Sequence, residues 1–308
     1  MLNIKIAIID YPDSLKSALY GFFELFNLAN KVCGEQGLHC RFSAHIETVS
    51  NKGSFTEMPF NIILLPPSNS SEFYLSPSKK LIDSLLQQHH SGAILCSACA
   101  GTFIVAATGL LTDKQVTTHW GLETLFRRLF PEVQLNVDKI LMNQGDIITA
   151  GGMMSWLDLG LEIIAQYTQP SVVHRLGKYL VIDTGKREQR FYRQFNPILN
   201  HSDALMLTIQ HTLKETFFYP LSIADIAQQN CLTERTFLRR FFKATQLRPK
   251  QYIQHLRIQK ACDLLESTND SFERIANNVG YENSGACRKL FVRIIGLTPS
   301  EFKKRFVE

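Results

Sequence analysis

Short apolar runs alternate with helical stretches through roughly the first 180 residues, and this alternation constrains the fold more than any other feature. The candidate buried strands are 2–9, 40–46, 60–65 and 93–96. Residues 14–32 carry apolar side chains at helical spacing, and a second helix is predicted over 77–90, with Pro77 near its start. Buried strands that alternate with helices predict a mostly parallel sheet covered on both faces, which is an α/β three-layer sandwich.

The pattern continues to about residue 180 and then changes. Its later members are strands near 115–119, 133–137 and 146–149, a helix over 121–130, and a helix after Gly151-Gly152. Residues 183–200 are charged and lack a periodic pattern, so we interpret them as a linker. From residue 201 onward only helices and short turns are predicted. The expected organisation is an α/β domain over 1–182, the linker over 183–200, and an all-α domain over 201–308.

The charge is divided unevenly between these parts. Residues 1–200 hold 17 Lys and Arg against 17 Asp and Glu. Residues 201–308 hold 16 against 11, which accounts for the whole net charge of +5. A basic C-terminal part joined to a neutral N-terminal part predicts that the second domain binds a polyanion.

Cysteine usage and hydropathy indicate the compartment. The seven cysteines, an odd number in a chain of this size, favour reduced thiols and a cytoplasmic location. The N-terminus carries Lys5 and Asp10 within its first ten residues, so no signal peptide is predicted. No membrane span is predicted either, because no apolar run is long enough.

The C-terminal third contains a helix, a tight turn and a second helix. Ser222 can cap the first helix, and Thr233 can cap the second, which is predicted over 233–245. Three aromatic residues of the second helix are expected to pack inward: Phe237, Phe241 and Phe242. Its basic residues are expected to project outward: Arg235, Arg239, Arg240 and Lys243.

About fifty residues later the same pattern returns. A short helix begins at Ser271 and stops at Gly280, and an outward helix over 283–295 bears Arg288, Lys289 and Arg293. A rigid helix over 249–267 lies between the two units, and such a spacer can place both second helices in successive major grooves of DNA. The alternative is a helical bundle with solvated basic faces. The repetition of the pattern favours the helix-turn-helix interpretation.

This region resembles the DNA-binding domain of AraC-type transcriptional regulators. The matching segments are IADIA (223–227), TERTFLRRF (233–241), RPKQYIQHLRIQKACDLL (248–265), FERIANNVGY (272–281) and GLTPSEFKKRF (296–306). The resemblance implies that double-stranded DNA is the partner and that the second helix of each unit faces it. The residues implied in the first recognition helix are Arg235, Leu238, Arg239 and Lys243. Those in the second are Ser284, Gly285, Ala286, Arg288 and Lys289.

Three positions depart from the usual AraC-type pattern. Leu238 is apolar, which favours contact with a thymine methyl group. Gln246 stands where the family usually has the glycine that ends the first recognition helix. Ser284-Gly285-Ala286 lacks long side chains, so the second unit is expected to contribute phosphate contacts and shape readout more than base contacts.

The N-terminal part contains the informative segment LCSACAGTFIVAATGLL (95–111). A strand that leads into Cys99, followed by Ala100, Gly101 and a helix, has the arrangement of a nucleophile elbow. The helix N-terminus can lower the pKa of the thiol, and His119, at a strand end, is suited to act as a base. An inert buried cysteine and a structural histidine are also compatible with these residues. Cys96 and Cys99 form an isolated C-x-x-C motif, so no metal site and no cofactor is expected.

Together with this elbow, further segments resemble the PfpI-type, class I glutamine amidotransferase-like domain, in particular the version fused to AraC-type regulators. They are LYGFFELFNLAN (19–30), GLLTDKQVTTHW (109–120) and TAGGMMSWLDLGLEII (149–164). The resemblance implies a flavodoxin-like sandwich. Catalytic members place an acidic side chain from the first helix against the cysteine, and the alignment puts Ala18 there. We therefore expect a ligand site in which Cys99 and His119 are vestigial. Strand ends would supply its residues: Asp10, Cys99, Ala100, Gly101, His119, Trp120, Gly151 and Gly152.

Two functional hypotheses follow. The first is a transcriptional regulator whose N-terminal domain binds a small effector and forms a homodimer, while the C-terminal domain binds promoter DNA. RNA polymerase would be a further partner of an activator, and the resemblance implies an amino acid or a quaternary amine as effector. The second is a cysteine-dependent hydrolase or amidotransferase-like enzyme with a helical appendage, which depends on Cys99 and His119 alone. The absence of the acid favours the first.

Overall fold

The computed structural model describes residues 2–49, 58–185 and 188–307, which divide into two compact units. The first unit comprises Met1–Gln189 and the second Arg190–Glu308. The boundary falls inside the segment 183–200 that was interpreted as a linker. The short 3-10 helix η2 (Gln189–Tyr192) begins at this boundary. Within the described ranges, no helix is long and apolar enough to cross a membrane.

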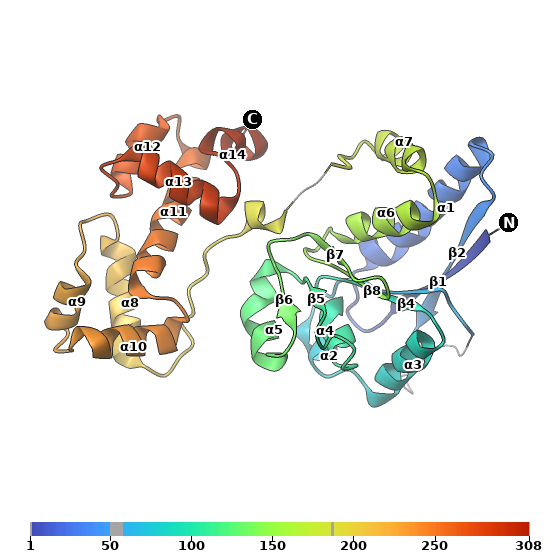
Figure 1. Cartoon of the computed structure of the whole chain (residues 1–308), viewed down its shortest axis with the longest axis horizontal. Coiled ribbons are helices and arrows are strands. Elements are labelled where there is room, and N and C mark those ends of the chain that lie inside the picture. The colour runs from blue at the N-terminus through green and yellow to red at the C-terminus, as the bar shows by residue number, and fades with distance from the viewer. Residues whose placement is uncertain (1, 50–57, 186–187, 308) are drawn as a thin grey trace. The chain divides into compact units, whose positions relative to one another are not determined.

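A six-stranded sheet with the order β2-β1-β3-β4-β8-β7 forms the centre of the first unit (Figure 1). Its strands are β1 (Leu2–Asp10), β2 (Cys40–Thr48), β3 (Ile62–Leu65), β4 (Ile94–Ala98), β7 (Leu141–Asn143) and β8 (Ile147–Ala150). The first five strands in this order are parallel, and only β7 runs antiparallel to its neighbour β8. The smaller strands β5 (Gln115–Val116) and β6 (Gln134–Leu135) pair in parallel with each other.

Helices cover both faces of the sheet, as the alternating sequence pattern predicts (Figure 1). One face packs on α1 (Lys16–Glu35), α6 (Trp156–Tyr167) and α7 (Pro170–Leu180). The other packs on α2 (Ser71–Leu75), α3 (Lys79–His90), α4 (Gly101–Ala106) and α5 (Glu123–Leu129). Side chains alternate along β1, so that Ile6 and Ile8 enter one core while Ala7 and Ile9 enter the other. The predicted flavodoxin-like sandwich with a mostly parallel sheet is confirmed.

The second unit is entirely helical within its described residues. Its helices are α8 (Ala204–Thr216), α9 (Ile223–Gln229), α10 (Glu234–Thr245), α11 (Pro249–Ser267), α12 (Phe272–Asn278), α13 (Ser284–Ile295) and α14 (Pro299–Phe306). They form two hydrophobic cores, and α11 contributes to both. Its first turns bring Tyr252 and Ile253 to the core of α8, α9 and α10, and its later turns bring Ile258 and Ala261 to the core of α12, α13 and α14.

The second helices of the two helix-turn-helix units, α10 and α13, begin with the same kind of N-cap and end with the same kind of C-cap, which explains why the sequence pattern repeats. Thr233 caps α10 by accepting a hydrogen bond from the Thr236 amide, and Asn283 caps α13 in the same way. Both helices end at a left-handed residue, Gln246 with φ 59° and Gly296 with φ 85°. Gln246 therefore adopts the backbone conformation for which the AraC-type pattern that this region resembles usually has glycine, and its Nε2 donates to the Lys243 carbonyl.

Candidate functional site

The carboxyl ends of β1, β4 and β8 bring several of the predicted site residues to one edge of the sheet. The Cys99 amide donates to the Ala150 carbonyl at 2.8 Å, so the residues that follow β4 lie beside those that follow β8. Thr118 Oγ1 donates to the Cys99 carbonyl at 2.7 Å and joins the segment after β5 to the same place. Parallel strands end at a common edge, and this edge is where ligands bind in open α/β sheets.

Cys99 occupies the strained turn that the strand, small residue and helix pattern predicts. Its φ is 54°, in the left-handed region that non-glycine residues rarely adopt. Gly101 follows because the turn passes close to β3, and a Cβ there would lie 2.6 Å from the Leu65 carbonyl oxygen. The backbone is thus that of an elbow which presents the Cys99 side chain at the end of β4.

The thiol of Cys99 is nevertheless held in its neutral form. Burial raises its pKa to about 12, and the hydrogen bond from the Ala100 amide opposes this only partly. The expectation that the helix N-terminus would lower this pKa is therefore wrong, because α4 has only six residues and desolvation is the larger effect. The sulfur donates to Met153 Sδ at 3.7 Å.

His119 does not serve Cys99 as a base in this structure. Its Nδ1 accepts the Gly121 amide at 3.0 Å, which caps the short helix η1 (Trp120–Leu122), and its ring lies 5.1 Å from the Trp120 ring. Burial lowers the pKa of His119 below its usual value, so the ring is neutral at pH 7. Among the described residues no hydrogen bond joins His119 to Cys99, and these residues also contain no cluster of His, Cys, Asp or Glu able to hold a metal ion.

The remaining polar groups of this edge are already paired. The Asp10 carboxylate accepts from Ser14 Oγ at 2.8 Å and forms an ion pair with Lys16. Ala18, which the sequence resemblance aligns with the acid of catalytic members, is fully buried in α1. Tyr11, which directly follows β1, is also buried, and its hydroxyl donates to the Pro66 carbonyl. The candidate site is therefore built from aromatic and sulfur side chains around a neutral thiol.

The second candidate surface is formed by the outward faces of α10 and α13. On α10 the exposed side chains include Arg235, Leu238, Arg239 and Lys243. On α13 they include Gly285, Ala286 and Lys289, while Ser284 is half-buried. Arg288 is less available, because its guanidinium lies 4.9 Å from the Phe272 ring and donates to Glu273 Oε1 at 3.4 Å.

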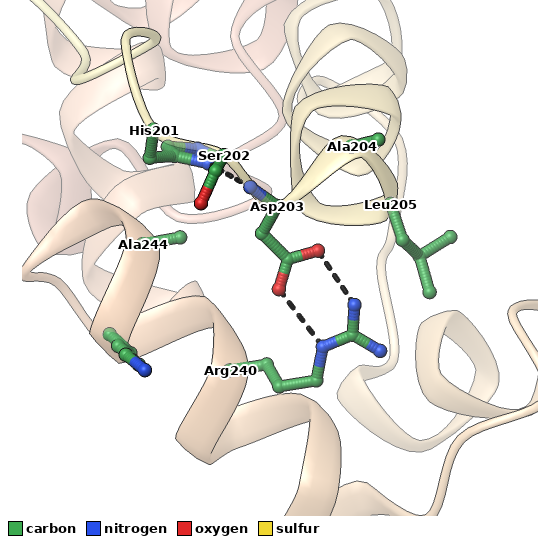
Figure 2. A pocket seen from close by; sticks show the side chains of 8 residues that line it. His201, Ser202, Asp203, Ala204, Leu205, Arg240 and Ala244 are labelled. Carbon is green, nitrogen blue, oxygen red and sulfur yellow. Dashed lines mark hydrogen bonds and ion pairs between the residues drawn. The ribbon is translucent and has the colours of Figure 1, made fainter.

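Two expectations for α10 are wrong. Arg240 does not project into solvent, because its guanidinium binds both carboxylate oxygens of Asp203 at 2.6 and 3.0 Å (Figure 2). Phe242 does not pack inward, because 49% of it is exposed. On this amphipathic helix the position of Phe242 lies beside Leu238 rather than beside Phe241, so the outward face of α10 carries an apolar strip between its basic residues.

The ion pair crosses a cleft of about 490 Å³ between the start of α8 and α10 (Figure 2). The cleft is lined by His201, Ser202, Asp203, Ala204, Leu205, Arg240, Lys243 and Ala244. His201 Nε2 lies 2.7 Å from Gln210 Oε1, which ties the loop before α8 to that helix. Arg240 and Asp203 thus attach α10 to the start of α8, and Lys243 also lines the cleft.

Comparison with known proteins identifies both units. Residues 26–166 match the DJ-1/PfpI family, and residues 226–305 match a helix-turn-helix domain. The chain carries a DJ-1/PfpI domain followed by an AraC-type helix-turn-helix domain. The DJ-1/PfpI domain holds the elbow of Cys99, and the helix-turn-helix domain holds α10 and α13.

Two similar proteins come from Pseudomonas aeruginosa. The HTH-type transcriptional regulator ArgR is 26% identical over 225 residues, which cover 71% of this chain and 66% of ArgR. The HTH-type transcriptional regulator CdhR is 23% identical over 222 residues, which cover 72% of this chain and 66% of CdhR. The match thus spans slightly less than two thirds of each relative. Among solved structures, DJ-1beta of Drosophila melanogaster is 15% identical and has a TM-score of 0.46, covering 59% of this chain and 100% of that one.

Several residues of the DJ-1/PfpI site were not found from the sequence. Tyr11 follows β1 directly and Met153 comes three residues after the end of β8, and their place after a strand end is a signal that could have indicated them. Gln189 has no such signal, yet its side chain is buried against the segment that carries His119. It comes from the stretch that the sequence indicates as a linker.

The high pKa of Cys99 predicts that this thiol resists alkylation in the folded protein. With a pKa of about 12, only about one molecule in 10,000 carries the thiolate at pH 8. Cys231 of the helix-turn-helix domain is exposed, so it should react first with iodoacetamide. Peptide mass mapping after native and denatured labelling would test this. Modification of native Cys99 as fast as that of Cys231 would contradict it.

The ion pair of Asp203 and Arg240 predicts a pH-dependent contribution to stability. The hydrogen bonds from Arg240 lower the pKa of Asp203 below its unfolded value, so the stabilisation is present above that unfolded value and is lost as the pH falls through the folded one. Asp203→Asn keeps a cap for α8 but removes the charge. Urea unfolding should therefore show a less stable variant at pH 7, with the difference from the unmodified protein shrinking below about pH 4. A difference that stays constant with pH would exclude the ion pair as its cause.

Proposed function

We propose that this protein is a sequence-specific DNA-binding transcriptional regulator. The observation that supports this most is the repeated unit: α10 and α13 have equivalent caps and equivalent left-handed ends, and each turns an exposed basic face outward from its own core. The second helix of a helix-turn-helix unit enters the major groove in this way. The charge supports the same assignment, because the helix-turn-helix domain carries the whole positive excess of the chain.

The two recognition helices are proposed to act differently. Arg235 and Arg239 of α10 are long, exposed and able to pair with guanine in the major groove, and Leu238 between them suits a thymine methyl group. In α13 the corresponding positions hold Gly285, Arg288 and Lys289, and Arg288 is engaged with Phe272 and Glu273. Base recognition is therefore assigned mainly to α10, and phosphate contacts to Lys243 and Lys289.

DNA binding by the full chain provides the direct test. Duplexes would be selected from a random pool, and affinities for the selected and a scrambled duplex would be compared at several salt concentrations. The selected duplex should bind at least about 1,000-fold more tightly, and binding to both should weaken as salt rises. Equal affinity for both duplexes would contradict the proposal.

We further propose that the DJ-1/PfpI domain binds a small effector and forms the homodimer. His119 and Trp120 are partly exposed and supply aromatic surfaces, the Asp10 carboxylate is engaged by Ser14 and Lys16, and neutral His119 adds no charge. Such a site suits an amino acid or a quaternary amine, whose cation can lie against aromatic rings. Hydrolysis is not proposed, because the Cys99 thiol is protonated at neutral pH and has no base bonded to it.

A thermal-shift screen of the full chain would test effector binding. A compound that binds only the folded domain raises its unfolding temperature with increasing concentration. Amino acids and quaternary ammonium compounds should include at least one such ligand, and Trp120→Ala should abolish its effect. Failure of every compound in these two classes would overturn the effector assignment. Sedimentation of the full chain would test the homodimer.

A further inference from the structure

Gln189, the last residue of the first compact unit, is held there by hydrogen bonds at both ends of its side-chain carboxamide. Only 3% of it is exposed. Its side-chain Nε2 shares its two hydrogens among three acceptors, Thr117 Oγ1 at 3.1 Å, the Thr118 carbonyl at 2.9 Å and the Lys139 carbonyl at 3.0 Å. Its Oε1 accepts the Trp120 amide at 3.2 Å. A buried carboxamide with these partners has one favourable position, since leaving any of them unpaired is costly.

The main chain around Gln189 is anchored as well. The Gln189 amide donates to the Asp138 carbonyl at 2.8 Å, and Glu188 forms an antiparallel bridge with Lys139. The side chains of this last pair also form an ion pair at 2.5 Å. Gly151 leaves the room that the carboxamide needs, because a Cβ at this position would lie 1.8 Å from Gln189 Nε2.

The groups that hold Gln189 are also parts of the candidate effector site. Thr118, whose carbonyl accepts from Gln189, donates its hydroxyl to the Cys99 carbonyl. Trp120, whose amide donates to Gln189, lies against the His119 ring. On the other side, Arg190 already belongs to the helix-turn-helix domain. The Gln189 side chain therefore joins the Thr118–Trp120 segment of the candidate effector site to the chain segment that leads into the second unit.

We propose that Glu188 and Gln189 form a latch through which the effector site controls the helix-turn-helix domain. The latch is closed while Gln189 keeps its hydrogen bonds, and the chain segment that leads to Arg190 then begins beside the Thr117–Trp120 segment. A ligand that moves the Thr117–Trp120 segment removes the partners of Gln189, and the latch opens. Opening releases Glu188 and Gln189, and two extended residues span about 7 Å. Coupling between the effector site and the DNA-binding surface requires an element with two states whose equilibrium each site can shift. The latch is that element. This inference rests on the proposed regulatory function.

The first experiment measures the latch without DNA. Gln189→Ala removes every side-chain hydrogen bond of Gln189, and Gln194→Ala is the matched control, because Gln194 is exposed. Amide hydrogen exchange of the full chain should become at least about 10-fold faster at Trp120 and Gln189 in Gln189→Ala. Gln194→Ala should leave both amides unchanged. Unaltered exchange in Gln189→Ala would overturn the latch.

A second variant tests, without a known ligand, whether a change in the candidate effector site alters the latch. Thr118→Val removes the hydroxyl that bonds the Cys99 carbonyl but keeps the Thr118 carbonyl that accepts from Gln189. Exchange at the Gln189 amide should accelerate at least about 3-fold, because the segment that carries the acceptor is loosened. If this amide is unaffected, then the site does not control the latch and the proposal fails.

The third experiment tests whether the state of the latch changes the affinity of the chain for DNA. Lys139→Cys with Glu188→Cys, in a Cys231→Ser background, places two cysteines on bridged residues and locks the latch upon oxidation. Affinity for the duplex selected by the unmodified chain should change at least about 3-fold between the locked and reduced forms. It should change in the opposite direction in Gln189→Ala. Equal affinities in all forms would overturn the coupling. If the unmodified chain binds no DNA, the regulatory function fails, and the exchange measurements still decide whether the latch exists.

Discussion

Replacing Phe241 by alanine should lower the free energy of unfolding of the helix-turn-helix domain by about 3–5 kcal/mol. Phe241 is fully buried on the inner face of α10. Its ring packs at 5.4 Å against the Phe237 ring and at 5.2 Å against the Tyr252 ring, so it links the recognition helix to α11. Alanine would leave a cavity at the centre of the core of α8, α9 and α10, and the surrounding aromatic rings could close it only in part.

The neighbouring residue supplies the matched control. Phe242→Ala removes the same side chain from the same helix, but 49% of Phe242 is exposed, so this change should cost less than about 1 kcal/mol. Chemical unfolding followed by circular dichroism at 222 nm, which reports the helical domain strongly, would compare the two. Equal losses in both variants would show that the inner and outer faces of α10 are assigned wrongly.

The second large effect is expected in DNA binding. Arg239→Ala should weaken binding to the selected duplex by about 1–3 kcal/mol, which is roughly 5- to 150-fold, and should relax the preference for one base pair. Arg239 is exposed on α10, and the described residues offer it no ion pair, in contrast to Arg240, which is bound to Asp203. Its guanidinium is therefore free to pair with guanine.

Arg239→Lys distinguishes base recognition from simple charge attraction. Lysine keeps the positive charge but loses the planar fork that pairs with guanine, so the variant should keep most of the salt dependence while losing the base preference. Competition binding with duplexes substituted at each position would measure this. Full retention of the preference in Arg239→Lys would assign Arg239 to phosphate contacts only.

The sandwich could be predicted from sequence because its signals are local. Each buried strand is a run of mostly apolar residues. In the helical unit the signals are local as well, because Thr233 and Asn283 mark the N-terminal ends of α10 and α13. The edge strand β7 was not predicted, because it is short and none of its residues is fully buried, so it leaves almost no apolar pattern. The strand near 115–119 is shorter than predicted, since Thr117 and Thr118 use their polar groups to join other segments instead of continuing the ladder.

The candidate sites were predictable in position but less so in chemistry. The elbow of Cys99 follows from small residues after a strand, yet the direction of its pKa shift depends on burial by distant segments, which spacing does not reveal. Basic residues on α10 look equivalent in the sequence, and only the structure pairs Arg240 with Asp203, 37 residues away. Gln189 was missed for the same reason, because all its side-chain partners lie at least 50 residues earlier in the chain.

Helix α11 has a consequence for the DNA sites that this protein can accept. Because α11 is one continuous helix that enters both cores, its length determines the distance and the rotation between the two recognition helices. One added residue would turn the second unit by about 100° and move it by about 1.5 Å. Under the function proposed above, the length of α11 therefore sets the spacing between the two DNA segments that the recognition helices contact.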